Sequence, residues 1–222
     1  MLSQVASLNT LLTSDAGVVN ARPSSYSALQ LLGHAGNLTA WRFAAVAGPL
    51  LLSVRQFTDA RGVFAETYSR RSAAAFGFGE EFVQDNWSRS ERAGTVRGLH
   101  FQRRPYAQAK LVRAVRGRIF DVAVDLRHAS PTFGRHVAVE LAAGDGRMLY
   151  VPVGFAHGFC TLEPDTEVLY KVTGYYAPSH DHGLAWDDPA LGIDWPFGPA
   201  EALLSDKDRR QPLLADLPIV FD

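Results

Sequence analysis

The chain has 222 residues, of which 47% are hydrophobic and 20% are charged, and its formal net charge is -1. This composition is typical of a folded globular protein with a sizeable core, and it excludes a general electrostatic attraction to nucleic acids or anionic membranes. The single cysteine, Cys160, excludes an intrachain disulfide and a cysteine-based zinc site. Cys160 lies in an apolar run, which predicts a buried thiol and fits a cytoplasmic location.

Residues 1–42 differ from the rest of the chain because they are rich in Ser, Ala, Leu, Asn and Thr. We interpret them as an N-terminal extension that is poorly ordered or helical, with a short amphipathic helix as the candidate structure for 27–38. The main domain is placed at 43–222. The sequence shows no secretory signal and no apolar run long enough to span a bilayer, so we expect no membrane association.

From residue 50 onward the pattern predicts short β-strands. In 120–126 apolar residues alternate with Asp121, Ala123 and Asp125, which is typical of a strand with two different faces. Similar strands are expected at 135–141, 147–153, 158–162 and 167–173, separated by turn-forming segments. Closely spaced strands of this kind predict a mainly β protein, an antiparallel sandwich or barrel such as a jelly roll. Only short helices are expected near the C-terminus.

Positive charge is concentrated between Arg89 and Arg118, where nine Lys or Arg residues accompany a single acid, Glu91. An anionic partner is therefore expected for this stretch. Much of it alternates with apolar residues in a strand-like pattern. That favours a few inward-facing charges over an open nucleic-acid groove, which would require salt-sensitive DNA or RNA binding.

The segment TVRGLHFQ at 95–102 places three polar side chains among apolar neighbours. Strict alternation along a strand puts His100 and Gln102 on one face and Arg97 on the other. These polar groups are either hydrogen-bonded core residues or ligand contacts. The residues alone leave both interpretations open.

Three further polar clusters interrupt the apolar pattern. Arg61 and Glu66 flank a glycine turn, residues 84–86 read Gln-Asp-Asn, and His157 lies between small and aromatic residues. Each has a structural alternative, namely a turn ion pair, a cap and a hydrogen-bonded core histidine.

The common catalytic templates are not found in the sequence. It has no serine-hydrolase elbow, no phosphate-binding loop and no dinucleotide fingerprint. His180 and His182 form the only His-x-His pair, but they lie in a turn-rich segment without an obvious third ligand. We therefore predict no metal site.

Several motifs together are more specific than any one of them. In this order, and over about 50 to about 215, the chain resembles the dTDP-4-dehydrorhamnose 3,5-epimerase family through QDN (84–86), RGLHFQ (97–102), PYAQAKLVR (105–113), FDVAVDLR (120–127), GFAHGF (154–159) and YKVTGYY (170–176). The resemblance implies a cupin-type β jelly roll, a homodimer, and neither a metal nor an organic cofactor. It also implies epimerisation at C3 and C5 of dTDP-4-keto-6-deoxy-D-glucose, giving dTDP-4-keto-L-rhamnose.

The resemblance assigns the proton-transfer roles residue by residue. His100 matches the base, with its carboxylate partner in LSDKD being Asp208 or, if the alignment slips, Asp206. Tyr170 matches the acid on the opposite side of the sugar. Lys110 matches the cation that stabilises the enolate oxygen and helps Tyr170 to release its proton.

The resemblance also implies a larger set of residues that contact the sugar nucleotide. Tyr176 matches an aromatic residue that stacks on thymine, and Asp181 stands where the family is expected to have a glutamate. If Arg97 is to contact the ligand beside His100, a bulge or bend near Gly98 must redirect it. The implied ligand contacts are Arg61, Glu66, Gln84, Asp85, Asn86, Arg97, Lys110, His157, Tyr176 and Asp181.

Two other functions remain open at this point. An epimerase that inverts only C3 or only C5, in another deoxysugar pathway, would use the same base and acid. A non-catalytic jelly roll that binds sugar nucleotides would be expected to lack His100, Tyr170 or Lys110, and the sequence has all three.

Overall fold

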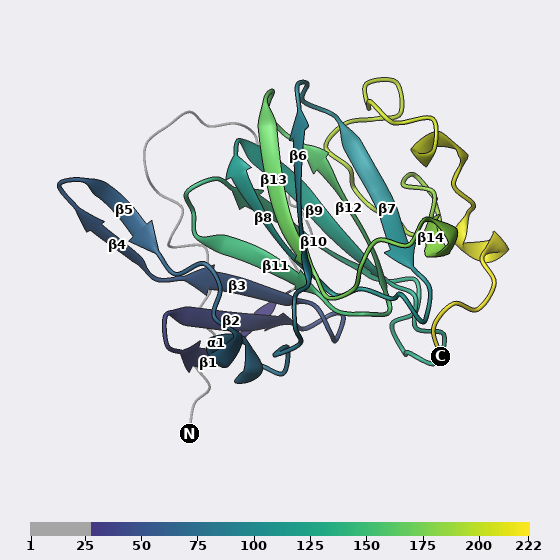
Figure 1. The fold of residues 1–222 in the computed structure, drawn as a ribbon. Coiled ribbons are helices and arrows are strands. Elements are labelled where there is room, and N and C mark those ends of the chain that lie inside the picture. The colour runs from purple at the N-terminus through teal and green to yellow at the C-terminus, as the bar shows by residue number, and fades with distance from the viewer. Residues whose placement is uncertain (1–27) are drawn as a thin grey trace.

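Two antiparallel β-sheets face each other in the computed structural model, which describes residues 28–222 (Figure 1). The larger sheet has seven strands, in the order β1 (Leu29–Ala35), β2 (Leu38–Phe43), β3 (Leu50–Val54), β11 (Arg147–Val151), β8 (Lys110–Arg116), β13 (Thr166–Val172) and β6 (Gln84–Ser90). The smaller sheet has five, in the order β10 (His136–Ala142), β9 (Arg118–Asp125), β12 (Phe155–Thr161), β7 (Val96–Gln102) and β14 (Asp181–Gly183). The predicted antiparallel β-sandwich is confirmed.

The remaining elements are short. Strands β4 (Gln56–Asp59) and β5 (Gly62–Ala65) form a separate hairpin that projects away from the sandwich, on the side opposite β7 and β14 (Figure 1). One helix, α1 (Arg70–Ala74), follows it. The turns η2 (Pro178–His180), η3 (Asp208–Arg210) and η4 (Leu214–Asp216) are single 3-10 turns, so the expectation of only short helices near the C-terminus is confirmed.

Strand β9 shows how alternation builds the core. Ala123 faces the larger sheet and belongs to the cluster between the sheets, together with Val112 and Val168. Val122 and its even-numbered neighbours face the other way, into a second cluster that contains Trp186 and Phe221 of the C-terminal segment. Because both faces are covered, seven of the eight residues of β9 are buried.

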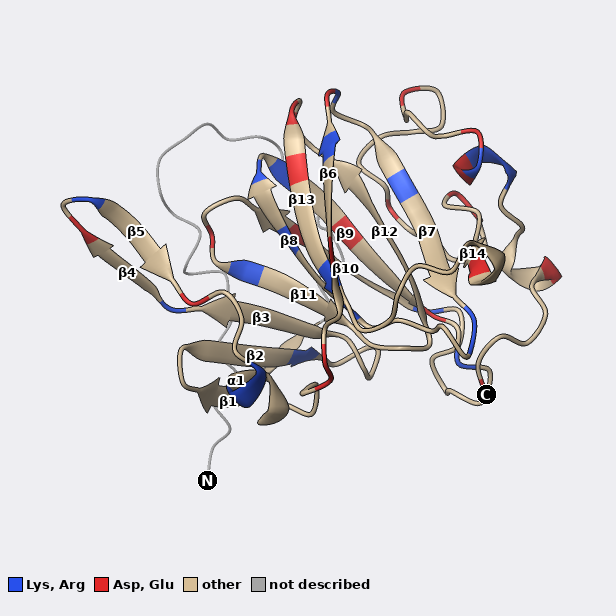
Figure 2. Ribbon diagram, in the orientation of Figure 1, with Lys and Arg blue, Asp and Glu red and all other residues tan. Residues whose placement is uncertain are grey.

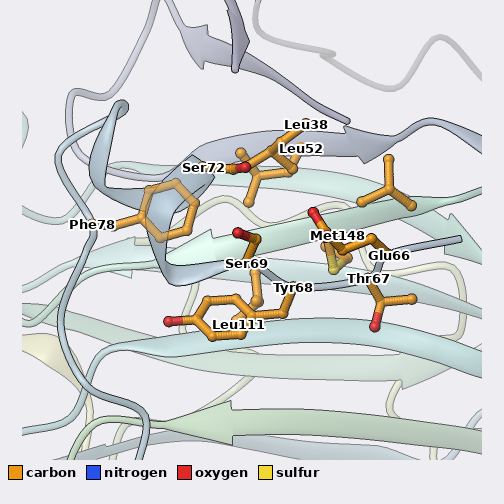
Figure 3. A pocket seen from close by; sticks show the side chains of 11 residues that line it. Leu38, Leu52, Glu66, Thr67, Tyr68, Ser69, Ser72, Phe78, Leu111 and Met148 are labelled. Atoms are coloured by element: carbon orange, nitrogen blue, oxygen red, sulfur yellow. The ribbon is translucent and has the colours of Figure 1, made fainter. Parts of the chain in front are cut away.

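The outer face of the larger sheet is covered by α1 and the segment that follows it. Phe78 is 1% exposed and its ring stacks on Tyr150 of β11, with the ring centroids 4.5 Å apart. A small cavity of about 10 Å³ remains in this layer, between Leu38 and Phe78, with Glu66 also on its wall (Figure 3). A cavity of this size admits at most a single water molecule.

The prediction of a helix at 27–38 is wrong, because β1 and β2 form a hairpin that extends the larger sheet. The two-residue connection Gly36–Asn37, with Gly36 at φ +59°, is typical of a β-hairpin and was the missed signal. The β-domain therefore includes residues before 43, among them Leu29–Ala35 and Leu38–Phe43. The rest of the predicted extension, 1–27, lies outside the described residues. Within 28–222, no helix combines the length and apolarity needed to cross a membrane.

Candidate active site between the sheets

A histidine–carboxylate pair joins β7 to the C-terminal segment. His100 Nε2 lies 2.5 Å from Oδ1 of Asp208, which is 5% exposed, whereas Asp206 is exposed. Burial alone would raise the pKa of Asp208, but the hydrogen bond to His100 and the histidine's charge outweigh it and keep this pKa below its ordinary value. An ionised carboxylate only accepts hydrogen bonds, so Nε2–H donates and Nδ1 is the nitrogen left for chemistry. Of the two aspartates considered, Asp208 makes the contact.

A β-bulge places Arg97 on the same face as His100. His100 pairs with His157 of β12, and Arg97 pairs with Phe159, so two residues of β7 lie opposite one residue of β12. Residues directly opposite each other project to the same side of a sheet. Arg97 and His100 therefore both project toward the larger sheet, and the bulge that the sequence required near Gly98 is present.

Two glycines make this bulge possible. Gly98 has φ +120°, and a Cβ built on it would lie 2.6 Å from the Cα of Gly158 on the neighbouring strand. Any side chain at Gly98 would therefore collide with the backbone of β12. The sequence segments RGLHFQ and GFAHGF thus fit each other through their glycines.

Lys110 enters the site from the facing sheet. It is the first residue of β8, and its Nζ donates a hydrogen bond of 3.3 Å to the backbone oxygen of His100. Burial lowers the pKa of Lys110 to about 8, although the negative charges of Asp181 and Asp121 oppose the shift. Lys110 is therefore mostly protonated at neutral pH, while its charge remains poorly solvated and available to an anion.

Tyr170 also comes from the facing sheet. It lies on β13 opposite Val112 of β8 and Asn86 of β6, and its side chain packs against the cluster between the sheets. Burial raises the pKa of Tyr170, and the charge of Arg97 partly offsets this. The phenol is therefore protonated at neutral pH. The cation that eases its ionisation is Arg97, where the sequence had suggested Lys110.

A second histidine–carboxylate pair, unforeseen in the sequence, lies beside the first. His157 Nε2 is 2.7 Å from Oδ1 of Asp121, and the two side chains are 5% and 0% exposed. Burial lowers the pKa of His157 despite the opposing charge of Asp121, so this imidazole is neutral at neutral pH. Oδ2 of Asp121 has no hydrogen-bond partner among the described residues. The signal was present, since Asp121 shares a face with Ala123 and is flanked by apolar residues in the strand.

Five polar side chains connect at the mouth of the site. Gln84 donates from Nε2 to Asn86 Oδ1 (2.9 Å) and accepts at Oε1 from the backbone N–H of Tyr176 (3.2 Å). The Tyr176 hydroxyl donates to Asp181 Oδ2 (2.9 Å), which also accepts from Lys207 Nζ at 2.5 Å. Tyr176 remains 57% exposed. A planar aromatic face is therefore available to a ligand beside the proton-transfer groups.

Three of the predicted ligand contacts are not in this cluster. Asp85 pairs with Lys171 at 2.8 Å on the outer face of the sheet, because successive side chains of β6 alternate. Asp85 therefore points away from this chain's own cluster, and its ligand contact stays a prediction. Arg61 pairs with Asp59 on the projecting hairpin, and Glu66 lies on the outer face of the larger sheet (Figures 1 and 3).

The basic stretch does not form one positive surface. Figure 2 shows Lys and Arg segments on β6, β7 and β8 interspersed with acidic segments on β9 and β13. Arg89 pairs with Asp165, and Arg118 pairs with Glu163. Two other members of this stretch belong to the histidine cluster: Arg97 projects from the same face as His100, and Lys110 donates to the backbone oxygen of His100. The local excess of positive charge is therefore divided between surface ion pairs and the histidine cluster.

These groups lie together between the two sheets, and their chemistry suits proton transfer. A carboxylate-held imidazole on one sheet faces a protonated phenol on the other, with an ammonium group nearby. Within the described residues, no group of three or more His, Cys, Asp or Glu side chains is arranged to hold a metal ion. Fold and site together define a jelly-roll protein equipped for general acid–base chemistry.

Comparisons with known proteins agree on one family. The sequence model of a family described as dTDP-4-dehydrorhamnose 3,5-epimerase matches residues 44–216. A protein of that name from Sinorhizobium fredii is 52% identical over 175 residues, covering 77% of this chain and 87% of the relative. A crystal structure of such an epimerase from Bacillus anthracis, with TDP and PPi bound, matches with a TM-score of 0.76 and 48% identity, covering 79% of this chain and 99% of that chain.

A second solved structure adds a bound sugar nucleotide. The Legionella pneumophila enzyme, in complex with dTDP-4-keto-L-rhamnose, matches with a TM-score of 0.77 and 38% identity, covering 82% of this chain and 95% of that chain. The chain therefore belongs to the dTDP-4-dehydrorhamnose 3,5-epimerase family, a family of isomerases.

Proposed function

We propose that the protein inverts C3 and C5 of dTDP-4-keto-6-deoxy-D-glucose and thereby forms dTDP-4-keto-L-rhamnose. One observation carries the proposal: His100 with its carboxylate stands on one sheet, and Tyr170 stands on the facing sheet. A sugar ring between the sheets would have a base on one face and an acid on the other. The dTDP-4-keto-L-rhamnose in the Legionella pneumophila relative supports this choice of product.

The chemistry follows from the C4 carbonyl of the substrate. It acidifies the protons at C3 and C5, because the electron pair left behind is delocalised onto O4 as an enolate. His100 removes the proton with Nδ1, and Asp208 stabilises the imidazolium that forms. Tyr170 then delivers its hydroxyl proton to the same carbon from the opposite face, which inverts the configuration. Solvent reprotonates Tyr170 and deprotonates His100 before the second carbon reacts, so no cofactor is required.

Lys110 acts on the oxygen that becomes negative, and His157 acts on a neighbouring sugar oxygen. The poorly solvated ammonium of Lys110 stabilises the enolate oxygen more strongly than a hydrated lysine would. His157, held through Nε2 by Asp121, presents Nδ1 as the remaining polar atom of its ring. We propose that it contacts a sugar oxygen beside O4.

The nucleotide is placed at the mouth of the site. We propose that the exposed face of Tyr176 stacks on thymine and that Arg97 binds the diphosphate, since a guanidinium suits phosphate oxygens. Gln84, Asn86 and Asp181 complete the contacts, as the hydrogen bonds that link them to one another or to Tyr176 suggest.

We further propose that the protein acts as a homodimer in the cytoplasm. The projecting β4–β5 hairpin exposes Phe57, Val63 and Phe64 by 41%, 62% and 70%, which is unusual for side chains of this kind on one small element. A second copy covering them would bring Arg61 and Glu66 to a site that they do not reach within their own chain. Phe64→Asp should then give a monomer by sedimentation and weaken dTDP binding, whereas Ile219→Asp, at another exposed apolar position, should do neither. A Phe64→Asp variant that remains dimeric would contradict the proposal.

Incubation with dTDP-4-keto-6-deoxy-D-glucose in deuterated water tests the function. Because the phenol exchanges with solvent, NMR should show deuterium at both C3 and C5 of the product. His100→Asn should retain dTDP binding but lose about 10²–10⁴-fold in exchange rate, the usual contribution of a general base. His34→Asn, a matched change at an exposed histidine bonded to Thr39, should react as the wild type does.

The same experiment separates the two alternatives. Deuterium at a single carbon would identify an epimerase that inverts only C3 or only C5. Tight dTDP binding without any exchange would identify a non-catalytic sugar-nucleotide-binding protein. Wild-type exchange by His100→Asn would remove His100 from the mechanism.

A further inference from the structure

Gln102 is a buried polar residue that the proton-transfer chemistry does not use. It lies at the end of β7, two positions after His100, and is 5% exposed. Its carboxamide donates from Nε2 to the backbone oxygens of Tyr106 (2.7 Å) and Tyr175 (3.1 Å). Its Oε1 accepts from the backbone N–H of Ala177 at 2.7 Å. Both donor hydrogens and one acceptor site are therefore committed to the backbone, which leaves little for a ligand.

These contacts converge on one residue of the site mouth. Tyr175 and Ala177, which flank Tyr176 in the chain, are both bonded to Gln102. Tyr176 is 57% exposed, so packing holds little of this residue. Its position must depend mainly on its backbone and on the hydrogen bond from its hydroxyl to Asp181.

Asp181 is tied to Gln102 as well. The two residues are paired across β14 and β7, so the carboxylate that receives the Tyr176 hydroxyl belongs to the strand next to Gln102. The Gln102 side chain thus joins the strand of the base to the segment of Tyr176, and the Gln102 backbone pairs with the strand of Asp181. Gln102 is therefore connected both to the strand of the base and to the segment that carries Tyr176.

We propose that Gln102 is a positioning residue for the nucleotide end of the site: its carboxamide holds the Tyr175–Ala177 backbone so that Tyr176 presents its ring to the base at a fixed distance from His100. This inference rests on the proposed function, in which Tyr176 stacks on thymine. Without Gln102 the segment samples other positions. Apparent affinity falls in proportion to the fraction of molecules in the binding-competent arrangement.

Gln102→Met tests the proposal because methionine has a similar length and no hydrogen-bonding amide. If the competent fraction falls to about a tenth, the Kd for dTDP and the KM for the sugar nucleotide both rise about tenfold, while kcat stays within about twofold. The matched control is Gln108→Met. Gln108 donates to the oxygen of Gly174 at 2.5 Å, just before the held segment, and its loss should change the Kd by less than about threefold because it contacts neither neighbour of Tyr176.

A double-mutant cycle distinguishes positioning from general structural support. In a Tyr176→Ala background, Gln102→Met should add less than about twofold to the Kd for dTDP, because the ring through which it acts is gone. If the double variant raised the Kd for dTDP by the product of the two single-variant effects, the proposal would be overturned. So would a folded Gln102→Met variant that binds dTDP like the wild type.

Two controls keep the outcomes separate. Thermal unfolding checks that Gln102→Met is folded; if it is not, Gln102→Asn, which retains the amide on a side chain one methylene shorter, carries the same expected rise in Kd. Failure of the wild type to bind dTDP or to exchange deuterium would refute the proposed function itself. Normal wild-type activity with an unaffected Gln102 variant would refute only the role of Gln102.

Discussion

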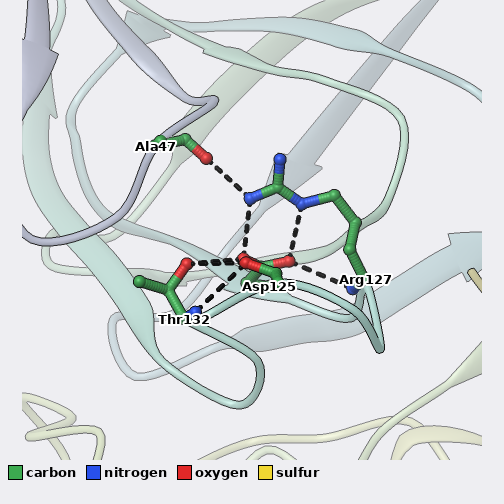
Figure 4. Close-up of polar contacts among 5 residues, drawn as sticks. Ala47, Asp125, Arg127 and Thr132 are labelled. Carbon is green, nitrogen blue, oxygen red and sulfur yellow. Dashed lines mark hydrogen bonds and ion pairs between the residues drawn. The ribbon is translucent and has the colours of Figure 1, made fainter. Parts of the chain in front are cut away.

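Asp121 and Asp125 lie four residues apart on β9, face the same side and are both 0% exposed, yet their surroundings differ. Asp125 is fully satisfied: Oδ1 accepts from the N–H and Nε of Arg127, and Oδ2 accepts from Nη2 of Arg127 and from the hydroxyls of Ser130 and Thr132 (Figure 4). Asp121 has one bond, to His157, and a second oxygen without a partner among the described residues.

The difference separates a structural carboxylate from a functional one. The Asp125 cluster closes on itself, and through Arg127 Nη2 it also holds the backbone oxygen of Ala47, joining two loops (Figure 4). A buried charge with an unsatisfied oxygen costs stability. Its presence is therefore explained by a function rather than by folding. We therefore expect substitutions at Asp125 to affect folding, and those at Asp121 to affect the reaction.

The largest effect is expected for Asp125→Ala. It leaves Arg127 and two hydroxyls without their acceptor, which should cost about 3–5 kcal/mol in the free energy of unfolding. Burial raises the pKa of Asp125, but hydrogen bonds from Arg127, Ser130 and Thr132 lower it more. The contribution of Asp125 to the free energy of unfolding is therefore present above its pKa of about 4 in the unfolded chain. It is lost as the pH falls through the lower pKa of the folded protein. Urea unfolding at several pH values measures both.

The activity of this variant completes the test. Per folded molecule, deuterium exchange by Asp125→Ala should stay within about twofold of the wild type, because none of the hydrogen bonds of Asp125 reaches either histidine pair. A stable variant with impaired exchange would reverse the assignment.

Asp121→Asn should show the opposite profile. The amide preserves the shape but removes the charge that orients His157 and raises the pKa of Lys110. We expect exchange to slow by about 10²-fold or more, by analogy with other histidines that lose their carboxylate, with little loss of stability. A drop in stability as large as that of Asp125→Ala, with normal exchange per folded molecule, would contradict the distinction.

The pH dependence sharpens the functional side of the comparison. Because burial lowers the pKa of Lys110 to about 8, its protonated fraction and the exchange rate should fall above that pH, by about tenfold per pH unit. Lys110→Arg should remove this decline whatever its residual rate, since guanidinium stays charged. In Asp121→Asn the decline should move to lower pH, because a negative charge that favours the ammonium is gone. An unchanged profile in both variants would exclude Lys110 as the titrating group.

The smallest effect is expected for Asp85→Asn. Asp85 is 55% exposed and pairs with Lys171 on the outer face, so its loss should cost less than about 1 kcal/mol and leave the KM unchanged. Asn86→Ala, the next residue on β6, projects toward the site and should raise the KM. If the Asp85 variant raised the KM and the Asn86 variant did not, the assignment of the two faces of β6 would be wrong.

Much of the fold was readable from periodicity. The alternation in 120–126 predicted a strand with two faces, and both faces are buried in different clusters. The hairpin of β1 and β2 was missed because the apolar pattern of 27–38 also suits a helix, and the Gly36–Asn37 turn was not weighed against it. Tertiary pairing with β3 decided between the two.

The site could be predicted in part, for a similar reason. His100 was singled out because TVRGLHFQ places several polar residues among the apolar residues of a predicted strand. Asp121 was overlooked because aspartates that alternate with apolar residues in a strand are typical of a solvent-facing side. Its role depends on His157, which only sheet pairing brings within 2.7 Å.

The sequence by itself determined the period of the strands, the glycines at 98 and 158, and the kinds of side chain available for proton transfer. These are local properties, set by residue type and spacing. Tertiary structure decided which carboxylate meets which partner. It brought Asp208 rather than Asp206 to His100, and on one strand it left an oxygen of Asp121 without a partner among the described residues while both oxygens of Asp125 are hydrogen-bonded. Such choices depend on groups distant in sequence, because the surroundings of a buried charge are assembled only when the sheets pack together.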